Sequence, residues 1–241
     1  MEGPPRLRGG ASLLFFKPYG VLSQFTPEPG SRWGCLADHI AVPEVYAAGR
    51  LDADSEGLLV LTGHGRLQQR LTDPGFGHWR RYWAQVEGDA GARPALIRQL
   101  AEGVVVQQRL TLPARARVLS SAEVAAARLP ERDPPIRQRL HRPTSWLEIE
   151  LREGRNRQLR RMTAAVGLPT LRLIRTAIDL MDGKPPLNLA GLQPGQWRWC
   201  DQAELRRLDG LLALRRPSGW PSPGRGGRAG GGKSGRAGGG G

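Results

Sequence analysis

The chain has 241 residues, with 36 lysines and arginines against 22 aspartates and glutamates, which gives a formal charge of +14. Its two cysteines, Cys35 and Cys200, form no CxxC pattern, which excludes a disulfide framework and a cysteine-based zinc knuckle. No apolar run approaches the roughly 18 residues of a membrane span. The basic excess indicates a polyanionic partner, most simply a nucleic acid, and the cysteine usage suits the cytoplasm.

The composition changes near residue 217. Residues 217–241 contain twelve glycines, three prolines and four basic residues but no acid. Such a segment cannot bury enough apolar surface to offset the entropy lost on ordering, so we predict a disordered basic tail. We expect residues 1–11 to be a flexible N-terminus and residues 12–216 to form the folded body. The phosphate-loop pattern GxxxxGKS at residues 227–234 lies in this tail, without the flanking strand and helix that such a loop needs.

The apolar pattern of the body switches between strand and helix periods. Alternating or continuous apolar runs predict strands over residues 12–16, 21–25, 57–62, 82–86, 145–151 and 171–178, with β-like character over residues 104–118. Helical spacing predicts helices over residues 66–71, 94–102 and 156–166, and residues 122–143 are expected to form a loop. The order lacks a regular strand–helix–strand repeat, so we predict an α+β fold with a mostly antiparallel sheet.

An acidic turn leads directly into an apolar strand at residues 49–62, GRLDADSEGLLVLT. Three interpretations fit: an ordinary charged loop, a metal site at Asp52 and Asp54, or a reactive aspartate held by an arginine. The metal site has little support, because the four histidines are scattered and no further carboxylate has a suitable spacing. The spacing alone leaves the other two interpretations open.

A basic helix is predicted to follow residues 153–157, EGRNR. Leu159, Met162 and Val166 share one face and should be buried. Arg157 and Arg161 lie one turn apart on another face, where like charges repel mildly. A solvated basic face is one interpretation. A bound phosphate is the other, because it would relieve the repulsion and guanidinium groups bind phosphate bidentately.

A third motif, RRYWAQVEG, occupies residues 80–88 and places Tyr82, Ala84 and Val86 on one face of a strand. Basic residues interleaved with aromatic residues can bind phosphates and stack on bases. On this motif alone, a core tyrosine with a satisfied hydroxyl is the favoured interpretation.

These three motifs, in this order, resemble those of the rRNA pseudouridine synthases of the RsuA/RluB/RluE/RluF branch. The resemblance runs from about Leu13 to Trp199 and includes shorter stretches such as KPY at residues 17–19 and PTSWL at residues 143–147. It implies the pseudouridine synthase catalytic fold, with a mixed, largely antiparallel central sheet, flanking helices and a basic cleft. It also implies a reaction that needs no metal or organic cofactor: the C1′–N1 bond of a uridine in RNA breaks, the uracil turns, and its C5 joins C1′.

The resemblance implies roles for residues of the motifs. Asp52 matches the essential aspartate, which either attacks C1′ or removes a sugar proton. Arg160 matches the arginine that pairs with this aspartate, and Tyr82 matches the tyrosine that stacks on the base. Many relatives have a lysine where this chain has Arg80. The residues expected to bind RNA are Lys17, Arg50, Arg80, Arg155, Arg157 and Arg161.

The shorter stretches are similar to branch members that modify 23S rRNA, so the expected partner is 23S rRNA or a large-subunit assembly intermediate. Residues 1–11 are too few for the S4 RNA-binding domain of many relatives, so we expect the catalytic domain itself to capture RNA. We expect a cytoplasmic monomer. The alternative is a non-catalytic rRNA-binding or assembly factor on the same fold, which would not need Asp52, Tyr82 and Arg160 together.

Overall fold

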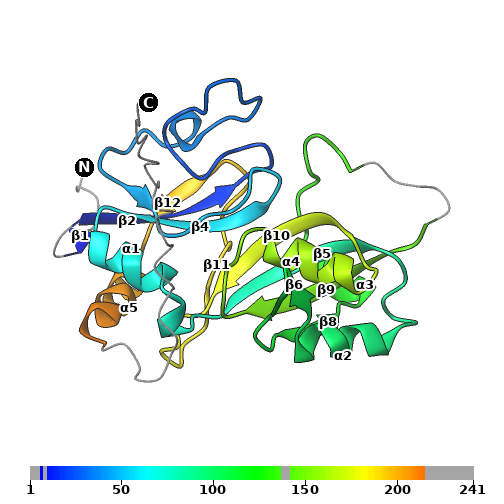
Figure 1. The fold of residues 1–241 in the computed structure, drawn as a ribbon. Helices are drawn as coiled ribbons and strands as arrows, with labels where there is room; N and C mark the ends of the chain where they lie inside the picture. Colours follow the sequence, from blue (N-terminus) through cyan, green and yellow to red (C-terminus); the bar gives the residue numbers. More distant parts are fainter. Residues whose placement is uncertain (1–5, 8–9, 137–141, 215–241) are drawn as a thin grey trace, which may run out of the picture.

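The computed structural model describes residues 6–7, 10–136 and 142–214, arranged as in Figure 1. The strands are β1 (Arg6–Leu7), β2 (Gly10–Lys17), β3 (Tyr46–Ala47), β4 (Glu56–Thr62), β5 (Arg80–Glu87), β6 (Val105–Val106), β7 (Arg109–Leu110), β8 (Arg115–Val118), β9 (Thr144–Leu151), β10 (Thr170–Ile178), β11 (Leu187–Asn188) and β12 (Trp197–Trp199). The helices are α1 (Gly65–Thr72), α2 (Pro94–Glu102), α3 (Ser121–Ala126), α4 (Gln158–Ala165) and α5 (Gln202–Ala213).

A single large sheet connects most of these strands in the order β1-β2-β4-β10-β5-β9-β8. Three short strands extend it: β12 pairs with β2, β3 with β4, and β11 with β10. Neighbouring strands are antiparallel except β4 and β10, which run parallel. The predicted α+β fold with a mixed, largely antiparallel sheet is confirmed.

The parallel contact between β4 and β10 joins the two halves of the sheet. A Cβ atom on Gly57 would lie 2.3 Å from the backbone oxygen of Arg175, and Gly57 has a φ of +113°, so this position requires glycine. Beside it, the guanidinium of Arg172 donates to both carboxylate oxygens of Glu56 at 2.9 and 2.7 Å, and both side chains are buried. The start of β4 is therefore clamped to β10.

Strand β4 is buried on both faces. Leu58 and Val60 belong to an apolar cluster with α1 and α5, which lie side by side in Figure 1. Leu59 and Leu61 belong to a second cluster on the opposite face. This double burial explains why the sequence shows a continuous apolar run here instead of an alternating one.

The other half of the sheet is covered by α2 and α4. Ala84 and Val86 of β5 pack in one cluster with Leu159, Met162 and Val166. The predicted buried face of α4 is therefore confirmed. Helix α4 begins at Gln158, two residues later than predicted.

Two strands in the first part of the chain differ from the prediction. Residues 21–25 form no strand, and Val21 makes a single parallel bridge to Gly34. Strand β2 begins at Gly10 and pairs with β1, so part of the predicted flexible N-terminus belongs to the sheet.

The remaining differences are helices and three short strands, β3, β11 and β12, which lie where no strand was predicted. The loop predicted over residues 122–143 begins with α3, which Ser120 and Glu123 cap. Helix α5 lies where no element was predicted. Within the described ranges, every helix is too short or too polar to cross a lipid bilayer. The tail predicted over residues 217–241 lies outside the described residues.

Candidate active site

The loop between β3 and β4 carries Asp52, and hydrogen bonds fix its backbone. The hydroxyl of Ser23 donates to the carbonyl of Leu51 (2.8 Å) and accepts from the Leu51 N–H (3.0 Å). The N–H of Ser55 donates to the carbonyl of Asp52 at 3.0 Å. The Asp52 carboxylate, with 33% of its side chain exposed, therefore projects from a backbone held on both sides.

Lys17 supports this loop from inside the protein. Its side chain is fully buried, and its ammonium donates to the carbonyls of Val21 (2.6 Å), Pro18 (3.0 Å) and Ala53 (3.5 Å). Burial lowers the pKa of Lys17 to about 7. The expectation that Lys17 binds RNA is therefore corrected, because backbone oxygens enclose its charge and keep it from the surface.

Arg157 connects the two aspartates of the loop. It precedes α4 with a left-handed backbone (φ 48°, ψ 32°), a strained conformation for a residue other than glycine. Its guanidinium donates to both carboxylate oxygens of Asp54, at 2.9 and 2.8 Å, and its Nη1 lies 3.6 Å from Oδ2 of Asp52. Burial raises the pKa of Asp54, but the hydrogen bonds from Arg157 and the charges of Arg157 and Arg160 outweigh it, and the net pKa is lowered.

Arg160 holds the same loop through Asp54. Its Nη2 donates to the Asp54 carbonyl (2.7 Å), its Nη1 donates to the Thr170 carbonyl (3.3 Å), and its Nε lies 3.6 Å from Oδ2 of Asp54. The pairing expected between Arg160 and Asp52 is therefore not what the structure shows, because the ion pair of Asp52 is with Arg157. Arg157 lies at the helix end beside the loop, whereas Arg160 lies within the first turn and reaches the Asp54 backbone.

Strand β5 contributes Tyr82, whose half-buried ring lines the same pocket as Asp52. Arg80, on the same strand, behaves differently. Its guanidinium donates to the carbonyl of Leu71 at 2.8 Å, and burial lowers its pKa. This side chain ties β5 to the end of α1 and does not line the pocket, and its binding to RNA stays a prediction.

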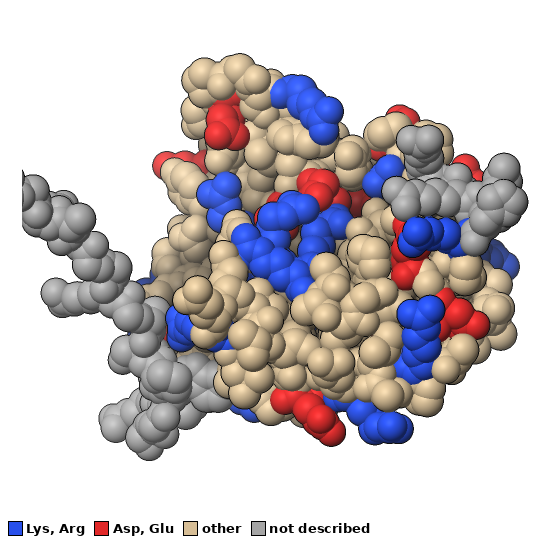
Figure 2. Space-filling view, turned by 45° about the vertical axis from the view of Figure 1, so that its right-hand side comes forward, with Lys and Arg blue, Asp and Glu red and all other residues tan. Residues whose placement is uncertain are grey.

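A pocket of about 320 Å³ lies between the Asp52 loop, β5 and the start of α4. Its volume is within the range of ligand sites in proteins. Figure 2 shows basic side chains gathered in the middle of one face, around a smaller acidic patch. Four arginines and two acids line the pocket, so its net charge favours a phosphate-bearing ligand. Six of the nine predicted site residues line it: Asp52, Tyr82, Arg160, Arg50, Arg155 and Arg157.

Several buried polar groups around this pocket have no hydrogen-bond partner among the described residues. They include the Nε of Arg155, the Nε of Arg160 and the hydroxyl of Ser55, which all belong to pocket-lining residues. Arg161 lies outside the pocket, where its Nη2 donates to Asn156 and its buried Nη1 has no acceptor. Buried polar groups are nearly always hydrogen-bonded, so these groups stand out as unsatisfied donors beside the pocket.

The sequence did not indicate the roles of two supporting residues, Ser55 and Ser23. Ser55 lies in the acidic motif, but its burial beside Asp52 depends on the fold. Ser23 holds Leu51 from a distant segment, and nothing in its local sequence indicated that contact. The part of the chain that the structure describes holds no group of three His, Cys, Asp or Glu side chains placed to bind a metal ion.

The chain is similar to known proteins over most of its length. A family model described as RNA pseudouridylate synthase matches residues 12–165. Ribosomal large subunit pseudouridine synthase E of Xanthomonas campestris pv. campestris is 50% identical over 194 residues, which cover 80% of this chain and 97% of that protein. The protein of the same name from Vibrio parahaemolyticus is 47% identical over 77% of this chain and 72% of its own length. Ribosomal large subunit pseudouridine synthase B of Bacillus subtilis is 32% identical over 83% of this chain and 71% of its own length.

The fold agrees with these matches. A crystal structure described as a pseudouridylate synthase aligns with a TM-score of 0.61, covering 83% of this chain and 74% of that chain at 23% identity. The matched range includes Asp52, Tyr82 and Arg160, which the structure gathers in one pocket. The chain therefore belongs to the RNA pseudouridylate synthase family.

Proposed function

We propose that this enzyme converts a specific uridine of 23S rRNA, free or in a large-subunit assembly intermediate, into pseudouridine. The observation that carries the proposal is the pocket of about 320 Å³ shared by Asp52, Tyr82 and four arginines. The choice of RNA is supported by relatives of 50% and 47% identity that are named as large-subunit synthases.

Asp52 is the residue that acts on the sugar. Its carboxylate either attacks C1′ as the C1′–N1 bond breaks or removes a sugar proton, and the same pocket accommodates both routes. Ser23, Ser55 and Arg157 hold the loop and the carboxylate in place, which is how a fixed geometry lowers a reaction barrier. The detached uracil then turns, C5 bonds to C1′, and the C5 proton is released.

Tyr82 and the arginines receive the nucleotide. A uridine must leave its base stack before Asp52 can reach C1′, and the Tyr82 ring replaces part of the lost stacking. Arg50 and Arg155 line the pocket and bind the flanking phosphates, while Arg161 lies on α4 just outside it. These phosphate contacts position the RNA without reading its sequence.

Release of tritium from RNA labelled at C5 of uridine tests the proposal, because the C5 proton is lost only when C5 is joined to C1′. We expect release from 23S transcripts or large-subunit particles and none from 16S RNA. Asp52→Asn should abolish release while RNA affinity stays largely unchanged. Asp209→Asn, an exposed position on α5, is the matched control and should behave as the wild type.

Turnover by Asp52→Asn at the wild-type rate would contradict the role of Asp52. Binding of 23S rRNA without any release, on particles as well as transcripts, would support a non-catalytic assembly factor instead. The proposal takes the protein as a cytoplasmic monomer, and sedimentation of the protein with and without RNA tests the oligomeric state.

A further inference from the structure

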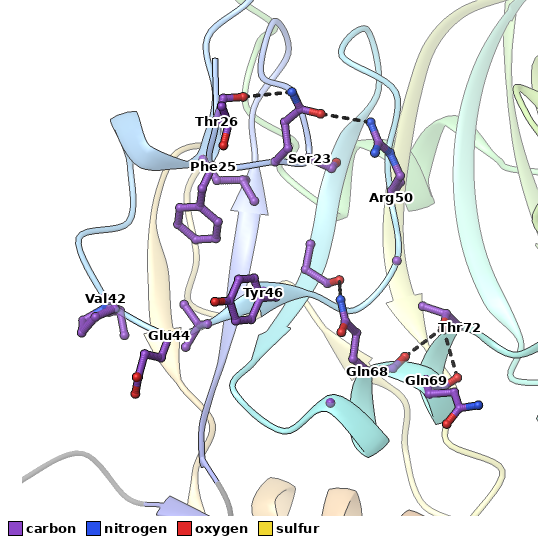
Figure 3. Close-up of a pocket in the computed structure, with 17 residues that line it drawn as sticks. Ser23, Phe25, Thr26, Val42, Glu44, Tyr46, Arg50, Gln68, Gln69 and Thr72 are labelled. Carbon is purple, nitrogen blue, oxygen red and sulfur yellow. Dashed lines mark hydrogen bonds between the residues drawn. The ribbon is translucent and has the colours of Figure 1, made fainter. Parts of the chain in front are cut away.

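A second hollow, of about 740 Å³, adjoins the active-site pocket at Arg50, which lines both. Figure 3 shows the rings of Phe25 and Tyr46 turned toward its interior, with Gln68 and Gln69 of α1 along another side. Tyr46 is 58% exposed, although it lies on the short strand β3, directly before the Asp52 loop. The hollow therefore combines aromatic and amide groups next to the site of reaction.

The chemistry of this lining suits a nucleobase better than a phosphate. Its charged side chains are Arg50 and Glu44, which lie at opposite ends of the view in Figure 3. The amide of Gln68 donates to the Ala47 carbonyl at 3.0 Å, which leaves its oxygen available, and the exposed Gln69 amide has no hydrogen-bond partner among the described residues. Aromatic faces stack on any base, and amides hydrogen-bond to base edges.

The active-site pocket has the complementary chemistry, because arginines dominate its charged lining. A nucleotide next to the target uridine needs both environments: a cation for the phosphate that links the two residues, and a neutral, stacking site for its base. Arg50 lies where the two cavities meet and can hold the linking phosphate. Beyond it, Phe25 and Tyr46 offer surfaces for the neighbouring base.

We propose that this hollow, defined by Phe25, Tyr46, Gln68 and Gln69, binds the base of a nucleotide adjacent to the target uridine. The proposal rests on the proposed function, because the neighbouring nucleotide belongs to the same RNA. Stacking on Tyr46 supplies affinity, and the amides of α1 select among bases. The subsite thus helps to choose the uridine that reaches Asp52.

A double-mutant cycle tests this subsite, with Tyr46 of the enzyme and one base of the RNA changed separately and together. The target is first mapped on 23S rRNA treated with the wild-type protein, and a short RNA carrying that uridine is made with an abasic residue at either neighbouring position. We expect one abasic position to lower kcat/KM of the wild type about tenfold, as loss of one stacked base does. Tyr46→Ala should cause a similar loss and become insensitive to that abasic position, whereas Tyr46→Phe should keep the sensitivity.

Two controls separate the possible outcomes. Met181→Ala removes another exposed apolar side chain, 50% exposed and outside both cavities, and should retain the wild-type response to each RNA. Two results would overturn the proposed subsite while leaving the proposed function intact. One is wild-type turnover by Tyr46→Ala, and the other is a combined loss in kcat/KM equal to the product of the losses from the Tyr46 change and the abasic residue.

A binding measurement on the mapped RNA tests the subsite independently of the reaction rate. The same RNA with 2-aminopurine at the neighbouring position should show fluorescence quenching on binding to the wild type and not to Tyr46→Ala. Absence of pseudouridine in 23S rRNA treated with the wild type would refute the proposed function, whereas a wild type that modifies the RNA without quenching 2-aminopurine would refute the subsite alone. Equal quenching by both proteins would exclude the subsite.

Discussion

Replacing Arg160 by alanine is expected to reduce stability more than replacing Arg157. Arg160 is 13% exposed, and its guanidinium donates to the backbone carbonyls of Asp54 and Thr170, at 2.7 and 3.3 Å. Hydrogen bonds from a charged donor contribute ~1.5–3 kcal/mol each. Since the second contact is long, Arg160→Ala should cost ~2–4 kcal/mol in the free energy of unfolding. That loss lowers Tm by about 5–15 °C in a domain of this size.

Arg157→Ala should mainly reduce catalysis. The Arg157 side chain is 41% exposed, and its partners Asp52 and Asp54 are 33% and 27% exposed. Water screens such partly exposed pairs, so their loss costs ~1 kcal/mol or less. The ion pair of Asp52 disappears, however, and a carboxylate misplaced by ~1 Å can lose about 100-fold in rate. We therefore expect a large fall in kcat with a small change in Tm.

Single-turnover pseudouridine formation and thermal unfolding, measured on the same preparations, separate the two effects. Arg157→Lys keeps one cation near Asp52 and should restore part of the rate, whereas Arg160→Lys cannot reach two carbonyls and should restore little stability. Wild-type turnover by Arg157→Ala would refute the assignment of Arg157 as the partner of Asp52. An unchanged Tm in Arg160→Ala would refute its role as a brace.

Three further changes probe the surroundings of the site. Ser55→Ala removes a buried pocket hydroxyl that has no hydrogen-bond partner among the described residues, so urea unfolding should show no loss of stability while kcat/KM falls about tenfold; a matching loss of stability would contradict a role toward substrate. Lys17 has a pKa lowered from 10.5 to about 7, so between these pH values the unfolded chain binds more protons than the folded protein. The free energy of unfolding should therefore rise with pH in that range, by at most ~1.4 kcal/mol per pH unit. Lys17→Met should flatten this rise, and an unaltered dependence of stability on pH would disprove the pKa shift. Gly57→Ala places a Cβ 2.3 Å from the Arg175 backbone and should cost more than ~3 kcal/mol in unfolding experiments; a stable variant would show that β10 can move away.

Elements with strong local signals were predictable from sequence. Helix α2 begins at Pro94 and ends before Gly103, as predicted, because proline suits the first turn and glycine follows the end. The segment 21–25 has a strand-like pattern, but within the described residues it makes only one isolated bridge, from Val21 to Gly34, and no local signal contains that information. Helix α5 did carry a signal, because Asp201 and Glu204 form a capping box before buried leucines.

The site was predictable from the sequence where a motif places reactive groups together. It was less predictable where the fold determines whether a charged side chain is buried or exposed. Asp52, Tyr82 and Arg160 line one pocket as the motifs imply. The sequence suggested that Lys17 and Arg80 are surface cations, yet Lys17 is buried and Arg80 is half-buried, and each donates to backbone carbonyls. A buried cation needs such acceptors, and these come from distant segments that no local pattern can indicate.

The two halves of the sheet each supply part of the active site. The β3–β4 loop, with Asp52, belongs to the half that α1 and α5 cover, whereas Tyr82 and Arg157 come from the half that α2 and α4 cover. Their relative position depends on the parallel contact of β4 and β10, where Gly57 permits close approach and the Glu56–Arg172 pair is buried. Because Glu56 follows the Asp52 loop by only a few residues, this clamp fixes the loop against the side of the pocket that β5 and the start of α4 form. The glycine and glutamate of the motif therefore set the geometry of the pocket, although neither of them lines it.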